Sequence, residues 1–197
     1  MSQTVWWIAD YAARGGLRYE PDADERWLRV WEPYATLKTP IRYEHALYLT
    51  GTRGSLTIAR MVLTGPDPIA PNLKPVGPEA WVVIGQDERL TVGRAAALSD
   101  SNGVFGEGLD LVTLPRRATG DPAFDHVFAS FAETEADLAA ITPSLRKLVL
   151  GWRIPLHFEL RKGGFVLAPV ALRADPQSLG WLVQAAQLFG EKAAKTA

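Results

Sequence analysis

Residues 42–63 read RYEHALYLTGTRGSLTIARMVL, and this stretch decides the class of fold. Two β-rich runs, 42–50 and 55–63, flank a short loop whose two glycines can adopt the positive φ that a tight turn needs. Strands joined by so short a loop are antiparallel, so the stretch predicts a β-hairpin. Alternation along the first strand places four side chains on one face of the sheet: Tyr43, His45, Leu47 and Leu49.

Further strands are expected on the C-terminal side of this hairpin. A second hairpin is predicted from 154–161 and 165–172, which turn at Lys162-Gly163-Gly164. Apolar β-rich runs predict other strands at 80–84, 109–114 and 124–131, and a weaker one at 90–92.

Helices are expected before the first hairpin and around the second. The first predicted helix covers 4–14, and the next follows the turn at 21–24 and stops at Glu32-Pro33. Capping residues predict a short helix from Thr134, a helix over 142–151 and a long one from Asp175-Pro176 toward Lys195. The order predicts an α+β fold: a mostly antiparallel sheet built from hairpins, with N-terminal helices and a long C-terminal helix packed on it.

The length of 197 residues fits a single domain over 1–197. The segment 65–79 holds five prolines, too many for a helix or an inner strand, so it is interpreted as a surface loop and a possible point of subdivision.

Composition and charge exclude several classes of function. The absence of cysteine removes disulfides, thiolate nucleophiles and Cys-based zinc sites. The net charge of −1 has no basic block, which argues against a nucleic-acid partner. The N-terminus has no basic region before its apolar residues, and no stretch approaches the length of a membrane span. We therefore expect a soluble cytoplasmic protein with no membrane partner.

The three histidines are weak candidates for metal binding or catalysis. His157, Glu159 and Arg161 alternate with apolar residues, and we interpret them as the water-facing side of a half-buried sheet rather than as metal ligands. His45 and His126 have apolar neighbours on their predicted faces and are interpreted as hydrogen-bonded core histidines. The sequence also contains no G-x-S-x-G, P-loop or G-x-G-x-x-G motif, so we expect no metal and no cofactor.

Seven tryptophans are the unusual feature of the composition. In the C-terminal helix, one apolar stripe is expected to face the sheet: Leu179, Leu182, Val183, Ala186 and Phe189. A second ridge lies about 100° away and is the candidate partner surface for a protein or for self-association: Trp181, Ala185 and Leu188.

The stretch GDPAFD at 120–125, followed by TPSL at 142–145, resembles a pattern in uncharacterised bacterial proteins. In those proteins a G-D-P-x-F-D strand precedes a short helix and a T-P-x-L helix. The resemblance covers roughly 35 residues and implies no activity and no site residue.

Two hypotheses on function remain open. The first is a non-catalytic interaction or small-ligand-binding domain of a bacterial cytoplasmic protein, because no catalytic motif is present. The alternative is a hydrolase-like enzyme whose site is assembled from distant residues. A pocket that holds His45 or His126 beside a carboxylate, with a perturbed pKa, would favour the enzyme. A flat apolar patch around Trp181 would favour the interaction domain.

Overall fold

The computed structural model describes residues 6–51, 54–63, 80–91, 93–99, 114–170 and 172–195. The strands within these residues are β1 (Arg18–Asp22), β2 (Arg42–Gly51), β3 (Gly54–Val62), β4 (Ala80–Gln86), β5 (Ala95–Leu98), β6 (Arg116–Arg117), β7 (Ala129–Ala132), β8 (Leu156–Arg161) and β9 (Gly164–Pro169). The helices are α1 (Trp6–Gly15), α2 (Glu25–Arg29), α3 (Pro122–Asp125), α4 (Glu135–Ala139), α5 (Pro143–Trp152) and α6 (Pro176–Ala194).

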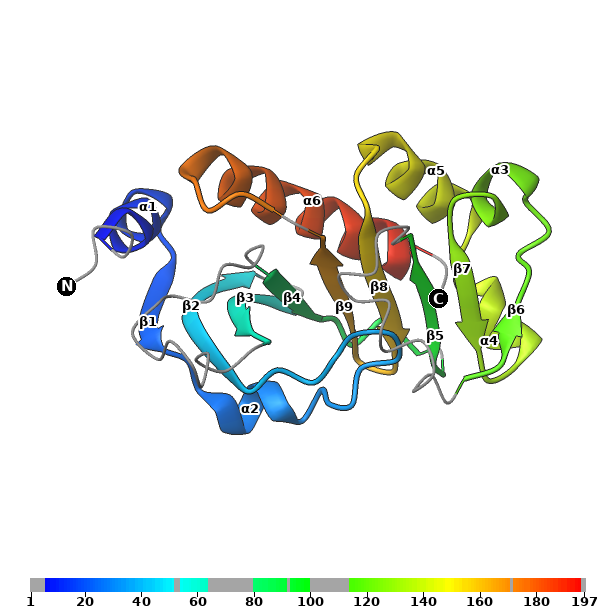
Figure 1. Cartoon of the computed structure of the whole chain (residues 1–197), viewed down its shortest axis with the longest axis horizontal. Helices are drawn as coiled ribbons and strands as arrows, with labels where there is room; N and C mark the ends of the chain where they lie inside the picture. The colour runs from blue at the N-terminus through cyan, green and yellow to red at the C-terminus, as the bar shows by residue number, and fades with distance from the viewer. Residues whose placement is uncertain are drawn as a thin grey trace, which may run out of the picture.

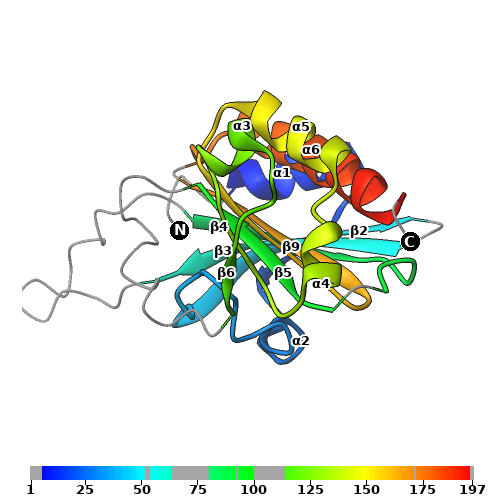
Figure 2. The same ribbon diagram turned by 90° about the vertical axis from the view of Figure 1, so that its right-hand side faces the viewer.

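The strands form one continuous antiparallel sheet in the order β1-β2-β3-β4-β9-β8-β5-β7-β6 (Figure 1). Helices α1, α3, α5 and α6 cover one face, and α2 lies on the other (Figure 2). The fold is therefore α+β, with N-terminal helices and a long C-terminal helix, as the sequence predicts. No helix within the described residues is long and apolar enough to cross a membrane.

Each face of the sheet has its own hydrophobic core. On the face of α6, the ring of Phe189 contacts those of Phe158 and Phe165, with centroids 5.3 and 5.0 Å apart. On the face of α2, Leu28 packs with Val82 and with other buried sheet residues. Because both faces are covered, central strands such as β4 and β9 are buried along nearly their whole length.

Capping residues define the helix starts that the sequence predicts. The side chains of Asp24, Thr142 and Asp175 each accept a hydrogen bond from a backbone N–H in the first turn of α2, α5 or α6. Thr134 and Asp137 form a reciprocal capping box on α4. After Arg29, backbone bonds from residue i to i−3 continue as far as Glu32, and the chain bends at Pro33.

The first hairpin is confirmed, but the alternation predicted for its first strand is wrong. The β2–β3 register shifts between Glu44 and Leu47, and His45 has a φ of 53°. This bulge reverses the side-chain direction, because it adds a residue to one strand only. Tyr43 consequently packs in the core beside α2, whereas Leu47 packs in the core beneath the helices on the other face.

Two other strand predictions need correction. Residues 122–125 form the helix α3 rather than part of a strand 124–131, because Asp121 caps a turn that has Pro122 at its first position. The strand near 90–92 lies instead at 95–98, where β7 and β8 pair on either side of it. The predicted strand 109–114, except Leu114, and the proline-rich segment 65–79 lie outside the described residues.

Candidate functional site

A buried ionic cluster lies on the α2 face of the sheet, under the segment 33–37. Glu159 of β8 has no exposed surface, and its Oε1 accepts hydrogen bonds from Arg94 Nε at 2.5 Å and Arg161 Nε at 2.6 Å. Burial alone raises the pKa of Glu159, but the hydrogen bond from Arg161 and the charges of Arg161 and Arg94 outweigh it and hold the pKa below its usual value. The carboxylate is therefore ionised at neutral pH.

The same cluster fastens the segment 33–37 to the sheet. Glu159 Oε2 accepts a hydrogen bond from the backbone N–H of Ala35 at 2.8 Å. Arg94 and Arg161 both donate to the carbonyl oxygen of Pro33. The buried carboxylate of Glu159 and its two arginines thus provide hydrogen bonds to the backbone of the segment 33–37, which does not belong to a strand.

His157 belongs to this cluster through the hydroxyl of Thr36, with which its Nδ1 shares a hydrogen bond. Its Nε2 lies 4.0 Å from Glu159 Oε2 and has no hydrogen-bond partner within the described part of the chain. Burial lowers the pKa of His157 to about 4, so the ring is neutral at neutral pH. The prediction that His157, Glu159 and Arg161 face water is wrong, because 33–37 covers this end of β8.

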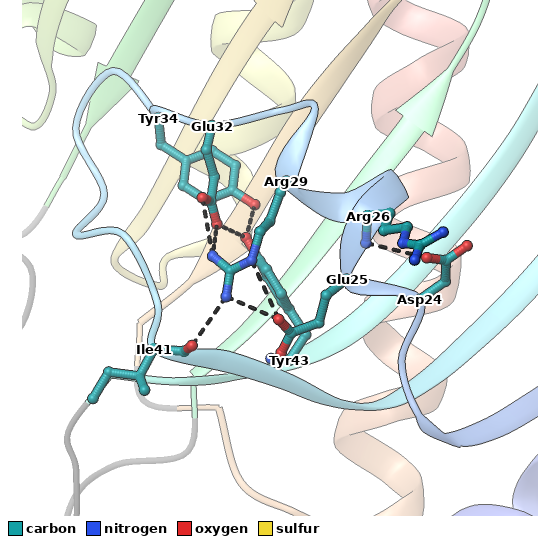
Figure 3. A network of polar contacts seen from close by, with 8 residues as sticks. All are labelled: Asp24, Glu25, Arg26, Arg29, Glu32, Tyr34, Ile41 and Tyr43. Atoms are coloured by element: carbon teal, nitrogen blue, oxygen red, sulfur yellow. Dashed lines mark hydrogen bonds and ion pairs between the residues drawn. The ribbon is translucent and has the colours of Figure 1, made fainter.

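A second polar network joins α2 to the residues that follow it and to the start of β2 (Figure 3). The guanidinium of Arg29 bonds to the carboxylates of Glu25 and Glu32, and to the carbonyl oxygen of Ile41. The hydroxyl of Tyr43 donates to Glu32 Oε1 at 2.7 Å. These bonds tie α2 and the segment after it to the start of β2.

Two buried tyrosines close this network. The hydroxyl oxygens of Tyr34 and Tyr43 are 2.7 Å apart, and burial raises the pKa of both phenols. Both therefore stay protonated and serve as hydrogen-bond donors. Apart from His157 Nε2, the polar groups of this network and of the cluster around Glu159 pair with one another, so the arrangement holds chain segments together. Among the described residues, no group of three or more His, Asp or Glu side chains could hold a metal ion.

The candidate binding site is a hollow on the opposite face, between the C-terminal half of α6 and the ends of β2, β3 and β4. Its volume is about 590 Å³, which is within the range of small-molecule sites. The wall is apolar on the sheet side and on part of the helix, from these residues: Leu49, Leu56, Phe165, Ala186 and Gly190. We name this space the α6 hollow.

Polar side chains form the rim of the α6 hollow. Asp87 binds Arg89 through both carboxylate oxygens, and Ser55 Oγ donates to Gln86 Oε1 at 2.8 Å. The hydrogen bonds that Arg89 donates to Asp87 raise the pKa of the Arg89 guanidinium, and the negative charges of Asp87 and Glu191 raise it further. With Lys195, the described part of the rim carries two acidic and two basic side chains, so the formal charges of these residues balance.

The predicted partner surface on α6 is not a continuous exposed ridge. Ala185 is only 3% exposed, and Trp181 packs edge-on against Trp152 of α5 with ring centroids 5.7 Å apart. Leu188 alone is substantially exposed, at 46%. The reason is that α6 contacts α1 and α5 as well as the sheet, so neighbouring helices cover the second stripe.

The other two histidines do not form a catalytic pair. His45 is half-buried, and its Nδ1 is 2.9 Å from the hydroxyl of Tyr19. His126 is exposed rather than buried in the core, because it caps the end of α3 instead of lying in a strand. It shares a hollow with Asp125, but both oxygens of that carboxylate accept hydrogen bonds from residues 119 and 120. The carboxylate of Asp125 therefore stabilises the turn at residues 119 and 120 and does not pair with His126.

Sequence reasoning missed the α6 hollow because its walls come from four separate stretches of the chain. Leu49 and Leu56 flank the first hairpin turn, Phe165 follows the second, and the helix side chains lie beyond residue 185. A partial signal was present in Gly190, where an added Cβ would lie 3.0 Å from the ring of Phe165. A glycine inside a helix pattern indicates such a close approach.

Comparison with known proteins gives a match in structure alone. No family model matches the sequence, and no curated protein matches it. The fold is similar to that in the crystal structure of the mycobacterial trehalose monomycolate transport factor A, TtfA, with a TM-score of 0.57 and 10% sequence identity. The match covers 98% of this chain and 95% of that one, so the likeness extends over the whole fold.

Proposed function

We propose that this protein is a non-catalytic binding domain that holds a small amphiphilic molecule in the α6 hollow. The observation that carries the proposal is the hollow itself, which combines an apolar wall with a polar rim. Such a combination is typical of sites that bury the apolar part of a ligand and orient its polar part.

The charges at the rim favour a ligand without net charge. Asp87 and Glu191 oppose Arg89 and Lys195, so an ion of either sign meets both attraction and repulsion. Neutral groups such as hydroxyls or amides can instead accept from the cations and donate to the carboxylates. The expected ligand is therefore a molecule with a short apolar chain and an uncharged hydrogen-bonding head.

The absence of an assembled catalytic group in the described sites supports a binding role over an enzymatic one. The carboxylate of Asp125 and the buried cluster around Glu159 are both engaged in holding backbone. The structurally similar protein TtfA is named as a transport factor. We further propose that the protein is bacterial and cytoplasmic.

The test uses octyl glucoside, which has an apolar chain and a neutral sugar head, below its micelle concentration. Saturation-transfer NMR and calorimetry should show saturable binding to the wild-type protein. Gln187→Trp fills the mouth of the hollow from an exposed position of α6 and should abolish it. Gln184→Trp is the matched control, since Gln184 is equally exposed one turn earlier and does not line the hollow.

Binding that disappears in Gln187→Trp and persists in Gln184→Trp supports the proposal. Lack of saturable binding to the wild type, or equal binding to both variants, rejects it.

A further inference from the structure

A second hollow lies on the helix-covered face of the sheet. It is formed where α3 and the C-terminal end of α5 meet the C-terminal end of β5 and the N-terminal end of β7. Its volume is about 620 Å³. The apolar part of its wall comes from these residues: Leu98, Val127, Phe128, Val149, Leu150 and Ile154. Val127 is 50% exposed, so apolar surface is open to an occupant. We name this space the α5 hollow.

Two arginines distinguish the α5 hollow from the α6 hollow. Arg116 of β6 and Arg153 at the end of α5 both line it, and both are exposed. Within the described residues, neither forms an ion pair, in contrast to Arg117 and Arg146 nearby. Their charges are therefore available to an incoming group.

The remaining polar groups of the lining do not cancel this charge. Asp125 is the one acidic side chain in the described lining, and its carboxylate accepts three hydrogen bonds from residues 119 and 120. His126 adds a hydrogen-bond donor to the lining. The charged side chains of the described lining are two arginines and one hydrogen-bonded carboxylate, so their formal charges sum to +1.

The backbone at Arg153 is a separate observation. Arg153 is the C-cap of α5 and has a left-handed conformation, with φ 54° and ψ 31°. Glycine or asparagine fits this conformation better, because a longer side chain strains its Cβ against the backbone. A residue with a Cβ is thus conformationally unfavourable at this position, and strained residues concentrate at functional sites.

We propose that the α5 hollow binds an anion that carries an apolar chain, with Arg116 and Arg153 on the anionic head and the apolar wall on the chain. The shared chemistry is that of a fatty carboxylate or an anionic lipid head with its acyl chain. An acidic peptide is a poorer fit, because the space is a single hollow of small-molecule size rather than an extended groove.

Arg153→Gly separates this binding role from folding. Glycine relieves the left-handed backbone, so the variant should melt at the same or a higher temperature than the wild type. It also removes one of the two guanidinium groups, and loss of a charge-assisted hydrogen bond should weaken anion binding about tenfold or more. Lys147→Gln is the control, because it removes a positive charge from an exposed position of α5 outside the hollow.

The experiment titrates dodecanoate by calorimetry into the wild type, Arg153→Gly, Lys147→Gln and Gln187→Trp. Dodecanoate should bind the wild type, Lys147→Gln and Gln187→Trp alike, and Arg153→Gly at least about tenfold more weakly. Dodecanol, which has the chain without the charge, should bind Gln187→Trp, in which the mouth of the α6 hollow is filled, at least about tenfold more weakly than dodecanoate does. Unchanged binding by Gln187→Trp shows that the α6 hollow is not the site, so the result is independent of the proposed function.

Vesicles distinguish the two sources of the anion. Cosedimentation with phosphatidylglycerol-doped phosphatidylcholine vesicles, lost in Arg153→Gly, identifies a lipid head in a bilayer. Dodecanoate binding without cosedimentation identifies a free carboxylate. The proposal is overturned if Gln187→Trp binds dodecanol and dodecanoate with equal affinity, if Arg153→Gly binds dodecanoate as the wild type does, or if the wild type binds neither dodecanoate nor the vesicles.

Discussion

The backbone N–H of Ala35 donates to Glu159 Oε2 at 2.8 Å, and these two residues are 124 positions apart in the sequence. The contact joins a segment without regular structure to the middle of a central strand. Because the acceptor is a buried carboxylate held by two arginines, the stability of this part of the fold depends on a single ionised group.

Replacement of that group should strongly destabilise the protein. Glu159→Gln keeps the side-chain volume but leaves Arg94 and Arg161 without a counter-charge, which should lower the free energy of unfolding by about 3–5 kcal/mol. Glu135→Gln is the control, because its side chain is 74% exposed in its pair with Arg117 and should cost less than about 1 kcal/mol. Urea unfolding measures both. Equal effects would show that the buried cluster is not an anchor.

His157 should make stability depend on pH in the mildly acidic range. Its folded pKa of about 4 is below the ordinary value of 6.5, so between these values the unfolded chain binds a proton that the folded chain excludes. The free energy of unfolding should therefore fall by about 3 kcal/mol as the pH decreases through this window, at about 1.4 kcal/mol for each pKa unit. Below the ordinary pKa of its carboxyl, Glu159 should add a further loss as the pH falls.

Urea melts across that pH window measure the slope. His157→Gln should remove it, whereas His126→Gln, at an exposed position, should retain it. A wild-type protein with equal stability at both ends of the window would contradict a buried neutral histidine.

The two sides of α6 should respond differently to truncation. Leu182 is fully buried in the core beneath the helix, so Leu182→Ala should cost about 2–5 kcal/mol. Leu188 is largely exposed, and Leu188→Ala should change stability by less than about 0.5 kcal/mol. Sedimentation of Leu188→Ala also tests self-association, since a change in oligomeric state without a change in stability would identify Leu188 as a partner contact.

Two glycine substitutions should have opposite signs. At Gly164 an added Cβ would lie 2.2 Å from the carbonyl oxygen of Gly85 and 2.6 Å from the ring of Trp31, so Gly164→Ala should cost about 1–3 kcal/mol. At Gly151, in α5, nothing lies within 4 Å of the added Cβ, so Gly151→Ala should stabilise the protein by about 0.5–1 kcal/mol. Thermal melts of the two variants check both signs.

Local signals in the sequence are sufficient for the hairpins and for most helix starts. The glycine-bearing turns after β2 and β8 and the capping residues Thr134, Thr142 and Asp175 act within a few positions of the elements that they define. Such features need no knowledge of distant contacts, which is why the α+β class could be predicted.

The errors occur where distant contacts decide the structure. Ala95, Ala96 and Ala97 have little intrinsic preference for a strand, and β5 exists because β7 and β8 pair with it. Phe124 and Phe128 are spaced four apart, which fits both strand alternation and a helical turn; in the structure their rings stack with centroids 4.6 Å apart.

The candidate sites were beyond prediction for the same reason. Glu159 lies in a stretch whose alternation of polar and apolar residues is typical of a half-exposed strand. No residue near it in the sequence indicates that the segment 33–37 covers it. The walls of the α6 and α5 hollows likewise come from stretches that only the sheet order brings together.

The pairing of β4 with β9 has a consequence for how the protein is made. A ribosome releases β4 long before β9, so the nascent chain carries an unpaired strand edge of the apolar sequence AWVVIG through the synthesis of the residues between them. Unpaired apolar edges recruit other chains into intermolecular sheets. The interval before the second hairpin emerges is therefore when this chain most needs a chaperone, and slow translation between the two strands should lower its yield.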